Sequence, residues 1–389
     1  MKILILSANT GEGHNSCGKA LQEVFDQHGV ECEFADVLAI ASEKASKNAS
    51  SLYVDSLQGN AFARIYKLAT WVSNHWRFHR LSPIYLANKI YWRKLWHFIE
   101  AGQYDAIVTV HLFGAESLTG VKAEGKLHVP TFFIMTDYTL HAFLNDSELD
   151  YYVIPHEDLL PQWTASKIPF DHIFPIGIPV QRKTRENKIP KDEARKLALE
   201  TVLKRSGANG QVSADGNWML IMGGSMGFGN NAELVDALLK KADKNDKIIV
   251  VCGRNERGRV GLENRYKNEP RVYPIGYTDQ IPLLMNATDV LFSKPGGLSS
   301  TEAIIRNVPL IHTAPIPGIE SDNAQFFFDH GMSFYSLDIN KQVDAAIKLC
   351  HDTHYREHML KAQRDNSDPM AAEHIVQLVM HTLENNQTK

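Results

Sequence analysis

One pattern recurs along the sequence and constrains the fold of this chain most strongly: a short apolar run leads through a turn into a helical pattern. Its first copy begins at residues 2–7, passes Gly11 and Gly13, and continues with apolar residues at 20, 21, 24 and 25. A short run that is apolar throughout is typical of a parallel strand buried on both faces, and the helix after it predicts a βαβ unit. Further strands of this kind are predicted at residues 104–111, 131–135, 151–155, 218–222, 247–252, 272–275, 290–293 and 309–312.

The rhythm breaks once, between residues 181 and 213, where lysine, arginine, glutamate and asparagine dominate. A chain of 389 residues is too long for one typical core and long enough for two. We therefore predict two doubly wound α/β domains, residues 1–180 and 181–370, and expect a helix over residues 371–389 that packs back on the first domain. Ligands of such sheets bind at the carboxyl ends of the strands, so we expect the site in a central cleft between the halves.

Composition excludes several classes of function. The formal net charge of -4 gives no general reason to expect a nucleic-acid partner. No apolar stretch approaches the roughly 20 residues of a membrane-spanning helix, and the first apolar run is too short for a signal peptide. The four cysteines lie far apart, which predicts neither a zinc site nor a disulfide framework and fits a reducing cytoplasm.

Two glycine-rich turns follow predicted strands of the second half. Gly296 and Gly297 precede Ser299, Ser300 and Glu302, so the turn and the helix start can present backbone N–H groups to a phosphate, with Glu302 near a ribose. The alternative is a capped helix after a tight turn. The other turn, with Gly223 and Gly224, lacks the ending of a P-loop. Together the two turns predict a diphosphate approached by backbone.

Polar residues that follow the strands of the first half are candidates for acid–base chemistry. His14 stands just after the first glycine turn, where an imidazole can act as a general base; the alternative is a structural histidine. Asp137 and His141 follow another strand, and Asp137 can equally be a helix cap or an ion-pair partner. The sequence contains no D-x-D and no H-E-x-x-H motif, so we expect neither a metal ion nor another cofactor.

The stretch from 60 to 99 has seven Lys and Arg residues, no Asp or Glu, and four of the six tryptophans. Basic residues interleaved with tryptophan predict a surface for an anionic membrane. The alternatives are aromatic packing into a core and, less favoured, a nucleic-acid surface. The residues assigned to this membrane and acceptor surface are Trp71, Trp76, Arg77, Arg80, Trp92, Arg93 and Trp96.

As an ordered set, these motifs resemble the family 28 glycosyltransferases that make glycolipids, namely the diacylglycerol glucosyltransferases and monogalactosyldiacylglycerol synthases. The peptidoglycan N-acetylglucosaminyltransferase is a more distant relative. The resemblance runs over most of the chain. It is carried by residues 10–14, Thr136-Asp137-Tyr138 with His141, residues 177–180, Gly223-Gly224, residues 252–255 and residues 294–297.

The resemblance implies a GT-B fold of two Rossmann-like domains, with the lipid acceptor in the N-terminal one and the donor in the C-terminal one. It also implies an inverting transfer of a hexose from a UDP-sugar to diacylglycerol or a related glycolipid, without a metal ion. Such an enzyme would be peripheral on the inner face of the cell membrane. Gly13 and His14 would lie beside the acceptor and diphosphate, with His14 as the first candidate for the base and Asp137 as the second.

The donor residues that the resemblance implies lie in the second half. Arg254, Gly276 and Tyr277 would line the uracil pocket, Ser299 and Ser300 the phosphates, and Glu302 the ribose; Glu320 and Asn323 would contact sugar hydroxyls. One departure concerns Ile319, which stands where the family usually has glutamine. An aliphatic side chain cannot replace the hydrogen bonds of an amide, so the identity of the sugar stays open.

Two alternative functions share this architecture. A UDP-N-acetylglucosamine 2-epimerase would need the nucleotide sugar and no lipid, so the basic tryptophan-rich stretch would be of no use to it. A non-catalytic UDP-sugar-binding protein would bind the nucleotide without turnover.

Overall fold

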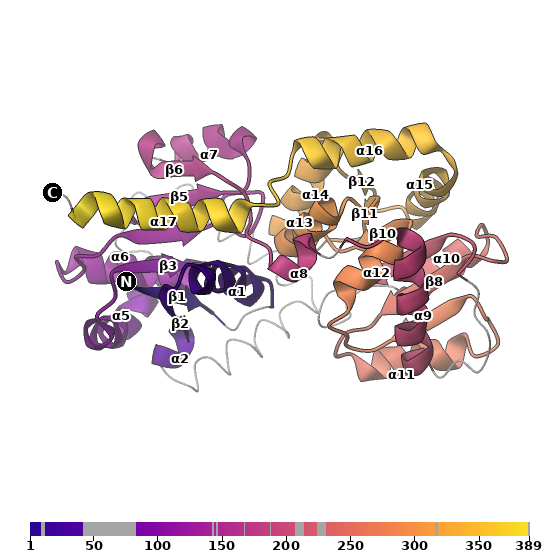
Figure 1. Ribbon diagram of the computed structural model, residues 1–389, viewed down its shortest axis with the longest axis horizontal. Coiled ribbons are helices and arrows are strands. Elements are labelled where there is room, and N and C mark those ends of the chain that lie inside the picture. Colours follow the sequence, from indigo (N-terminus) through magenta and orange to yellow (C-terminus); the bar gives the residue numbers. More distant parts are fainter. Residues whose placement is uncertain are drawn as a thin grey trace. The chain divides into compact units, whose positions relative to one another are not determined.

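The computed structural model describes residues 1–8, 12–41, 83–141, 144, 147–166, 168–186, 188–206, 214–223, 231–315 and 318–387. In this part of the chain, Figure 1 shows two sheets, each made of parallel strands and flanked by helices. The chain divides into two compact units. Unit 1 comprises Met1–Arg182, Ile316–Asp322 and Asp368–Lys389, and unit 2 comprises Lys183–Pro315 and Asn323–Ser367.

Unit 1 is built on a six-stranded sheet with the order β2-β1-β3-β4-β5-β6, in which all paired neighbours are parallel. Ile3, Leu4, Ile5 and Leu6 of β1 are fully buried, as the apolar run predicts. The strands are β1 (Lys2–Ser7), β2 (Glu31–Asp36), β3 (Ala106–Thr109), β4 (Thr131–Ile134), β5 (Tyr151–Ile154) and β6 (Ile173–Pro175).

The helices of unit 1 include the last helix of the chain, α17 (Ala371–Gln387), which packs against α1 (Glu12–Gln27). Ile375, Val376 and Val379 of α17 are fully buried. The remaining helices of this unit are α2 (Val37–Ala41), α5 (Pro83–Gly102), α6 (Leu112–Ala123), η3 (Glu157–Leu159), α7 (Leu160–Ala165) and η4 (Phe170–His172); the short α8 (Arg182–Arg185) begins at the boundary with unit 2.

Unit 2 has a second parallel sheet with the order β12-β11-β10-β7-β8-β9. Its core joins Ile221, Ile248, Val250 and Phe292 of the central strands to side chains of the covering helices. The strands are β7 (Trp218–Met222), β8 (Lys247–Val251), β9 (Val272–Ile275), β10 (Val290–Ser293), β11 (Leu310–His312) and β12 (Phe334–Tyr335). The helices are α9 (Lys191–Ser206), α10 (Asn231–Leu239), α11 (Glu256–Arg265), α12 (Ile281–Ala287), α13 (Gly297–Arg306), α15 (Ile339–His351) and α16 (Thr353–Asp365); α14 (Ile319–Asp329) begins in a segment of unit 1 and continues in unit 2 from Asn323.

The predicted doubly wound fold is confirmed, and every strand predicted from the sequence is present. Three strands were not predicted: β2, β6 and β12. Strand β2 lies at one edge of its sheet and none of its residues is fully buried, so charged residues such as Glu31 and Glu33 interrupt the apolar run. Strands β6 and β12 are edge strands of three and two residues, too short to show a pattern.

Within the described ranges, no helix combines the length and the apolar character that crossing a bilayer requires.

Candidate functional site

Three neighbouring strands of unit 1 bring polar side chains to one edge of the sheet. Strands β1, β3 and β4 are adjacent and parallel, so their carboxyl ends meet there. His14 lies in the first turn of α1 after β1, His111 is the N-cap of α6 after β3, and Asp137 follows β4. This edge is the candidate acid–base site.

His14 is held by one of its ring nitrogens. Nδ1 lies 2.9 Å from the carbonyl oxygen of Val110 and 3.1 Å from Oγ1 of Thr136. Because a carbonyl oxygen can only accept, Nδ1 carries the proton, and in the neutral ring Nε2 is left unprotonated. Burial lowers the pKa of His14, while the negative charge of Asp137 opposes that shift. The structure therefore favours a neutral imidazole with a basic Nε2.

His111 is a residue of this site that the sequence analysis missed. Its ring centroid lies 4.6 Å from that of His14, with the two ring planes at 74°, an edge-to-face arrangement. Its Nδ1 accepts a hydrogen bond from the backbone N–H of Phe113 at 3.1 Å, which caps α6. Burial, reinforced by the charges of His14 and His141, holds the pKa of His111 well below its ordinary value. The signal available in the sequence was its place as the first polar residue after an apolar strand.

Asp137 is paired with His141. Nε2 of His141 lies 3.0 Å from Oδ2 of Asp137, and both side chains are largely shielded from solvent. This contact fits the alternative that the sequence left open for Asp137 as the partner of a basic residue. The carboxylate nevertheless acts on His14, because its charge raises the pKa of that imidazole. Asp137 is thus placed to stabilise a protonated His14.

In unit 2, the start of α13 has the features of an anion site. Gly296 is the N-cap residue, with extended backbone angles, and no side chain caps the helix there. Nζ of Lys294 lies 3.9 Å from the position that a Cβ on Gly296 would take. The N–H groups of the first turn, the positive end of the helix dipole and a nearby ammonium group all favour a negative charge at this turn.

Ser300 does not contribute its hydroxyl to that turn. The side chain is fully buried, and Oγ lies 2.9 Å from Nε2 of His312. Nδ1 of His312 in turn lies 3.1 Å from Oγ of Ser333, and burial lowers the pKa of His312 to about 3. The Ser300 hydroxyl therefore contacts a buried histidine, and the predicted place of Ser300 beside the phosphates stays a prediction. Ser299, one position earlier, is only half-buried.

Glu302 is held within unit 2 by α8. Oγ1 of Thr184 donates to Oε1 of Glu302 at 3.4 Å, and Thr184 is almost fully buried. Burial raises the pKa of Glu302 to about 7, although the Thr184 bond and the charges of Lys183 and Arg306 act in the opposite direction. The carboxyl group thus holds its proton to a higher pH than an ordinary glutamate does, and its predicted contact with a ribose stays a prediction.

Arg254 and Tyr277 form a contact at the carboxyl ends of two adjacent strands of unit 2. The Arg254 guanidinium lies 5.5 Å from the centroid of the Tyr277 ring, and that ring is 57% exposed. Gly253, directly before Arg254, has a φ of 56°, a backbone conformation that favours glycine. An exposed ring supported by a cation offers a flat surface for an aromatic base. Gly276, beside the ring, is half-buried.

Asn323 and Glu320 both lie in α14 but differ in environment. The side chain of Asn323 is fully buried, and its Nδ2 donates to the carbonyl oxygen of Pro295 at 3.0 Å. The amide thus braces the turn that contains Pro295, and the predicted contact of Asn323 with a sugar stays a prediction. Glu320 is half-buried in the first turn of α14, and its predicted sugar contact stays a prediction.

Trp92 corrects the predicted membrane surface. The residue is 3% exposed, and its Nε1 donates to Oε1 of Glu124 at 3.0 Å. A Cβ added to Gly120 of α6 would lie 1.7 Å from Cε3 of Trp92, so the ring packs directly on the backbone of that helix. Trp92 is therefore a core residue, and its assignment to a membrane surface is wrong.

The remaining residues of that surface divide into two groups. Arg93 is exposed, and Trp96 is half-buried with Nζ of Lys126 4.3 Å from its ring centroid. Trp71, Trp76, Arg77 and Arg80 lie outside the described residues, as does Gly224 of the second glycine turn. Gly223 is described and buried directly after β7, and Gly13 is half-buried in the first turn of α1.

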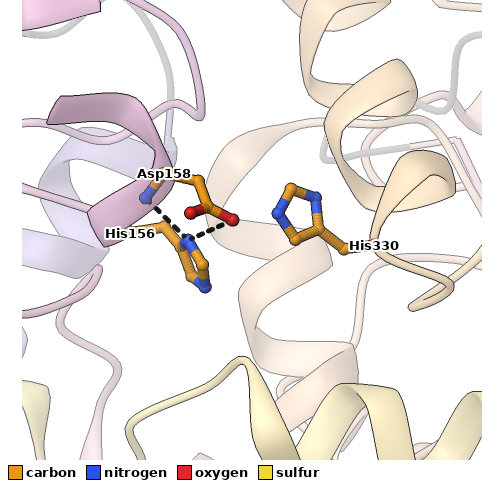
Figure 2. A group of neighbouring side chains, drawn as sticks. All are labelled: His156, Asp158 and His330. Atoms are coloured by element: carbon orange, nitrogen blue, oxygen red, sulfur yellow. Dashed lines mark hydrogen bonds and ion pairs between the residues drawn. The ribbon is translucent and has the colours of Figure 1, made fainter. Parts of the chain in front are cut away.

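Two further histidines outside the candidate site have local structural roles. Figure 2 shows His156 with Asp158, whose backbone N–H donates to Nδ1 of His156 at 3.2 Å and so caps η3. His330, also labelled there, belongs to unit 2, where its Nδ1 donates to the carbonyl oxygen of Phe326 at 2.8 Å. We assign no ligand to either histidine.

Comparisons with known proteins match both halves of the chain. Residues 14–180 match the model of the monogalactosyldiacylglycerol (MGDG) synthase family, and residues 218–378 match that of the glycosyltransferase family 28 C-terminal domain. A processive diacylglycerol beta-glucosyltransferase of Bacillus pumilus (strain SAFR-032) is 28% identical over 387 residues, covering 98% of this chain and 94% of the relative. The protein of the same name from Bacillus cereus (strain AH187) is 24% identical, covering 97% and 93%.

Solved structures with a similar fold include MurG of Acinetobacter baumannii, with a TM-score of 0.62, 15% identity, and coverage of 98% of this chain and 99% of that one. A UDP-GlcNAc 2-epimerase of Neisseria meningitidis also has a TM-score of 0.62, with 13% identity and coverage of 98% and 100%. At these identities the likeness shows the two-domain GT-B type of fold alone. Fold similarity therefore does not separate a transferase from an epimerase.

Proposed function

We propose that this chain transfers a hexose from a UDP-sugar to diacylglycerol or a related glycolipid. The proposal rests on its family, because the chain belongs to the family 28 glycosyltransferases of the diacylglycerol glucosyltransferase and monogalactosyldiacylglycerol synthase type. In this proposal the transfer inverts the configuration at the sugar and needs no metal ion. The observation that carries the proposal is the contact of His14 Nδ1 with the Val110 carbonyl oxygen at 2.9 Å, because it leaves Nε2 as the ring nitrogen that can accept a proton.

The acceptor half of the reaction is proton removal. His14 takes the proton of the lipid hydroxyl on Nε2 while the hydroxyl oxygen attacks C1 of the sugar, on the face opposite the diphosphate. The bond between C1 and the diphosphate oxygen breaks, and UDP leaves with the bonding pair. The charge of Asp137 stabilises the imidazolium that His14 becomes, as a carboxylate does for a general-base histidine in other enzymes.

In this proposal unit 2 binds the UDP-sugar donor. The uracil stacks against the Tyr277 ring, which Arg254 supports, and the diphosphate lies against the N-terminus of α13. Backbone N–H groups and Lys294 then stabilise the negative charge that develops on departing UDP, which is the part a metal ion plays in other transferases. The carboxyl group of Glu302 accepts a hydrogen bond from the ribose.

The proposed acceptor also implies where in the cell the enzyme acts. The lipid lies in a membrane, so we propose that the enzyme binds the inner face of the cell membrane peripherally. Arg93 and Lys94 of α5 are exposed and support this proposal. Anionic lipid attracts such residues at roughly 1 kcal/mol for each basic side chain near the surface.

The test is synthesis of a lipid-linked sugar. Purified protein is incubated with radiolabelled UDP-sugars and diacylglycerol in anionic vesicles, with a chelator present, and the lipid products are identified by mass spectrometry. We expect a hexosyl diacylglycerol to form with at least one donor. The absence of any lipid-linked product with all common UDP-sugars would refute the proposal, and epimerised nucleotide sugar without lipid product would point to an epimerase.

A variant separates catalysis from binding. His14→Ala is expected to bind UDP with unchanged affinity in calorimetry and to lose turnover by about 10²–10⁴-fold. Exposed His128, which follows the C-terminus of α6, supplies the matched control as His128→Asn. Turnover that survives in His14→Ala would remove His14 from the role of base.

A further inference from the structure

We propose that His111 is a positioning residue for His14: its ring, packed edge-to-face on the His14 ring, holds Nδ1 of His14 on the Val110 carbonyl and shields it from water. The proposal deepens the proposed function, because it explains why Nε2 of His14 is the nitrogen that accepts the proton.

The first support is that the contact is made by a fixed ring. His111 Nδ1 accepts from the backbone N–H of Phe113 at 3.1 Å, so rotation about its side-chain bonds would break a helix cap. The Phe113 ring lies against it, with centroids 4.9 Å apart. The ring of His111 is therefore held in place before it meets His14 at 4.6 Å.

The second support is that Val110 and His111 are consecutive residues. Val110 gives His14 its carbonyl acceptor, and His111 gives it the packing ring. The backbone N–H of Val110 donates to the carbonyl oxygen of Leu6 at 3.0 Å, which ties this segment to β1. One rigid piece of chain thus supplies both contacts that orient His14.

The third support concerns charge. Because Nδ1 of His111 accepts, a neutral His111 carries its proton on Nε2 and brings no positive charge to His14. Two ionisable groups from the segment after β4 act on His14: Asp137 raises its pKa and His141 lowers it. The hydrogen bond to the Val110 carbonyl, directly after β3, raises it as well. Burial is the largest effect and lowers the pKa of His14. Removing the His111 ring, which shields His14 from water, should then raise the pKa of His14 toward its ordinary value.

Two substitutions separate this role from the capping role of the same side chain. In His111→Asn the amide oxygen can still cap α6, and the ring is lost. We expect a melting temperature near that of the wild type, a kcat lower by at least about tenfold, an unchanged KM for the UDP-sugar, and an acid limb of the rate profile moved up by roughly 0.5–1 pH unit.

His111→Phe makes the opposite change, because it keeps a ring against His14 and loses the cap. We expect a melting temperature lower by about 2–4 °C, which corresponds to the loss of one cap in a unit of this size, and recovery of most of the kcat lost in His111→Asn. A purely structural His111 would give the reverse order of activities, with the less stable variant the less active one.

Nitrogen NMR of histidine-labelled protein tests the proposal without any turnover. The His14 signals are assigned with His14→Gln, and the tautomer and pKa of His14 are then compared in the wild type, His111→Asn and the control His128→Asn. We expect an Nδ1–H tautomer in the wild type and in the control, and in His111→Asn a mixed tautomer with a raised pKa.

The two hypotheses fail differently. If His111→Asn leaves the tautomer and pKa of His14 unchanged, the positioning role is overturned even if lipid-linked sugar is formed. If the wild type forms no lipid-linked sugar, the proposed function is lost, while the NMR comparison still decides whether His111 orients His14.

Discussion

The guanidinium of Arg254 lies 5.5 Å from the centre of the exposed Tyr277 ring, and the two residues follow the adjacent strands β8 and β9. Aromatic rings in such positions bind nucleobases by stacking, at about 1–3 kcal/mol for each base. The pair is therefore the part of unit 2 whose contribution to donor binding can be tested most directly.

Tyr277→Ala is expected to weaken UDP binding by roughly 5–150-fold, which is the stacking energy expressed as affinity. Tyr277→Phe keeps the stacking face and should bind UDP nearly as the wild type does. Calorimetry with UDP measures both. Phe170→Ala removes an exposed aromatic ring of unit 1 and serves as the control. Equal UDP affinities for Tyr277→Ala and the wild type would show that the uracil does not stack on this ring.

The pH dependence of the reaction distinguishes His14 from Asp137 as the base. Burial lowers the pKa of His14, so its neutral, active form persists below pH 6.5 and activity is lost only as the pH falls through the lowered value. Asp137→Asn removes a charge that raises this pKa. We expect its acid limb in kcat/KM to move to lower pH, with a reduced but measurable kcat. Complete loss of turnover in Asp137→Asn, with turnover retained in His14→Ala, would make Asp137 the base.

The two serines of α13 should respond differently to removal of the hydroxyl. Ser300→Ala leaves Nε2 of the buried His312 without its partner, so we expect unit 2 to lose about 1–3 kcal/mol of stability and to keep its affinity for UDP. Ser299→Ala should leave stability unchanged and weaken UDP binding. Thermal denaturation and calorimetry measure the two effects. A weakened UDP affinity in Ser300→Ala at full stability would show that the Ser300 hydroxyl itself contributes to phosphate binding.

Glu302 gives unit 2 a specific pH dependence of stability. Its pKa is about 7 in the folded protein and close to 4.5 in the unfolded chain, so between these values the folded state binds more protons. The stabilising effect of the protonated carboxyl group is complete below pH 4.5 and is lost as the pH rises through 7. Glu302→Gln should not lose stability in this way, so between pH 5 and pH 8 its free energy of unfolding should rise by about 1–3 kcal/mol relative to that of the wild type. Parallel stability curves for the two proteins by calorimetry would contradict a raised pKa at Glu302.

Ile319, the first residue of α14, offers a test of sugar preference. A glutamine at this position could hydrogen-bond a sugar hydroxyl, and sites built on such bonds discriminate strongly between sugars. Ile319→Gln is expected to change the ratio of kcat/KM for UDP-glucose and UDP-galactose by about tenfold or more. Ile319→Leu is the matched control. An unchanged ratio in Ile319→Gln would show that sugar selection lies elsewhere.

The fold was predictable because its central strands are buried on both faces, which leaves apolar runs that few other structures produce. The same runs located His14 and Asp137, since each lies where a buried strand has just ended. His111 has the same position after β3, yet it was counted within the apolar run at 104–111. A strand boundary misplaced by two residues was enough to hide it.

The burial of two predicted site residues, Ser300 and Trp92, depends on the helix face that each side chain occupies. Ser300 lies three and four residues before Ala303 and Ile304, which are both buried, so it shares their inward face. Trp92 lies three residues before buried Leu95, and its burial depends on Gly120 of another helix. The first relation can be read from spacing. The second joins distant parts of the chain and needs the tertiary structure.

The docking of α17 on α1 has a consequence for how the protein is made. Ile375, Val376 and Val379 belong to the core of the first unit, yet the ribosome adds them after the described strands of unit 2. Unit 2 can have its whole sheet in place while the earlier unit still exposes an apolar side of α1. Unit 1 is thus begun before unit 2 and completed after it, and a stop codon shortly before residue 371 would damage the unit whose strands all precede residue 182.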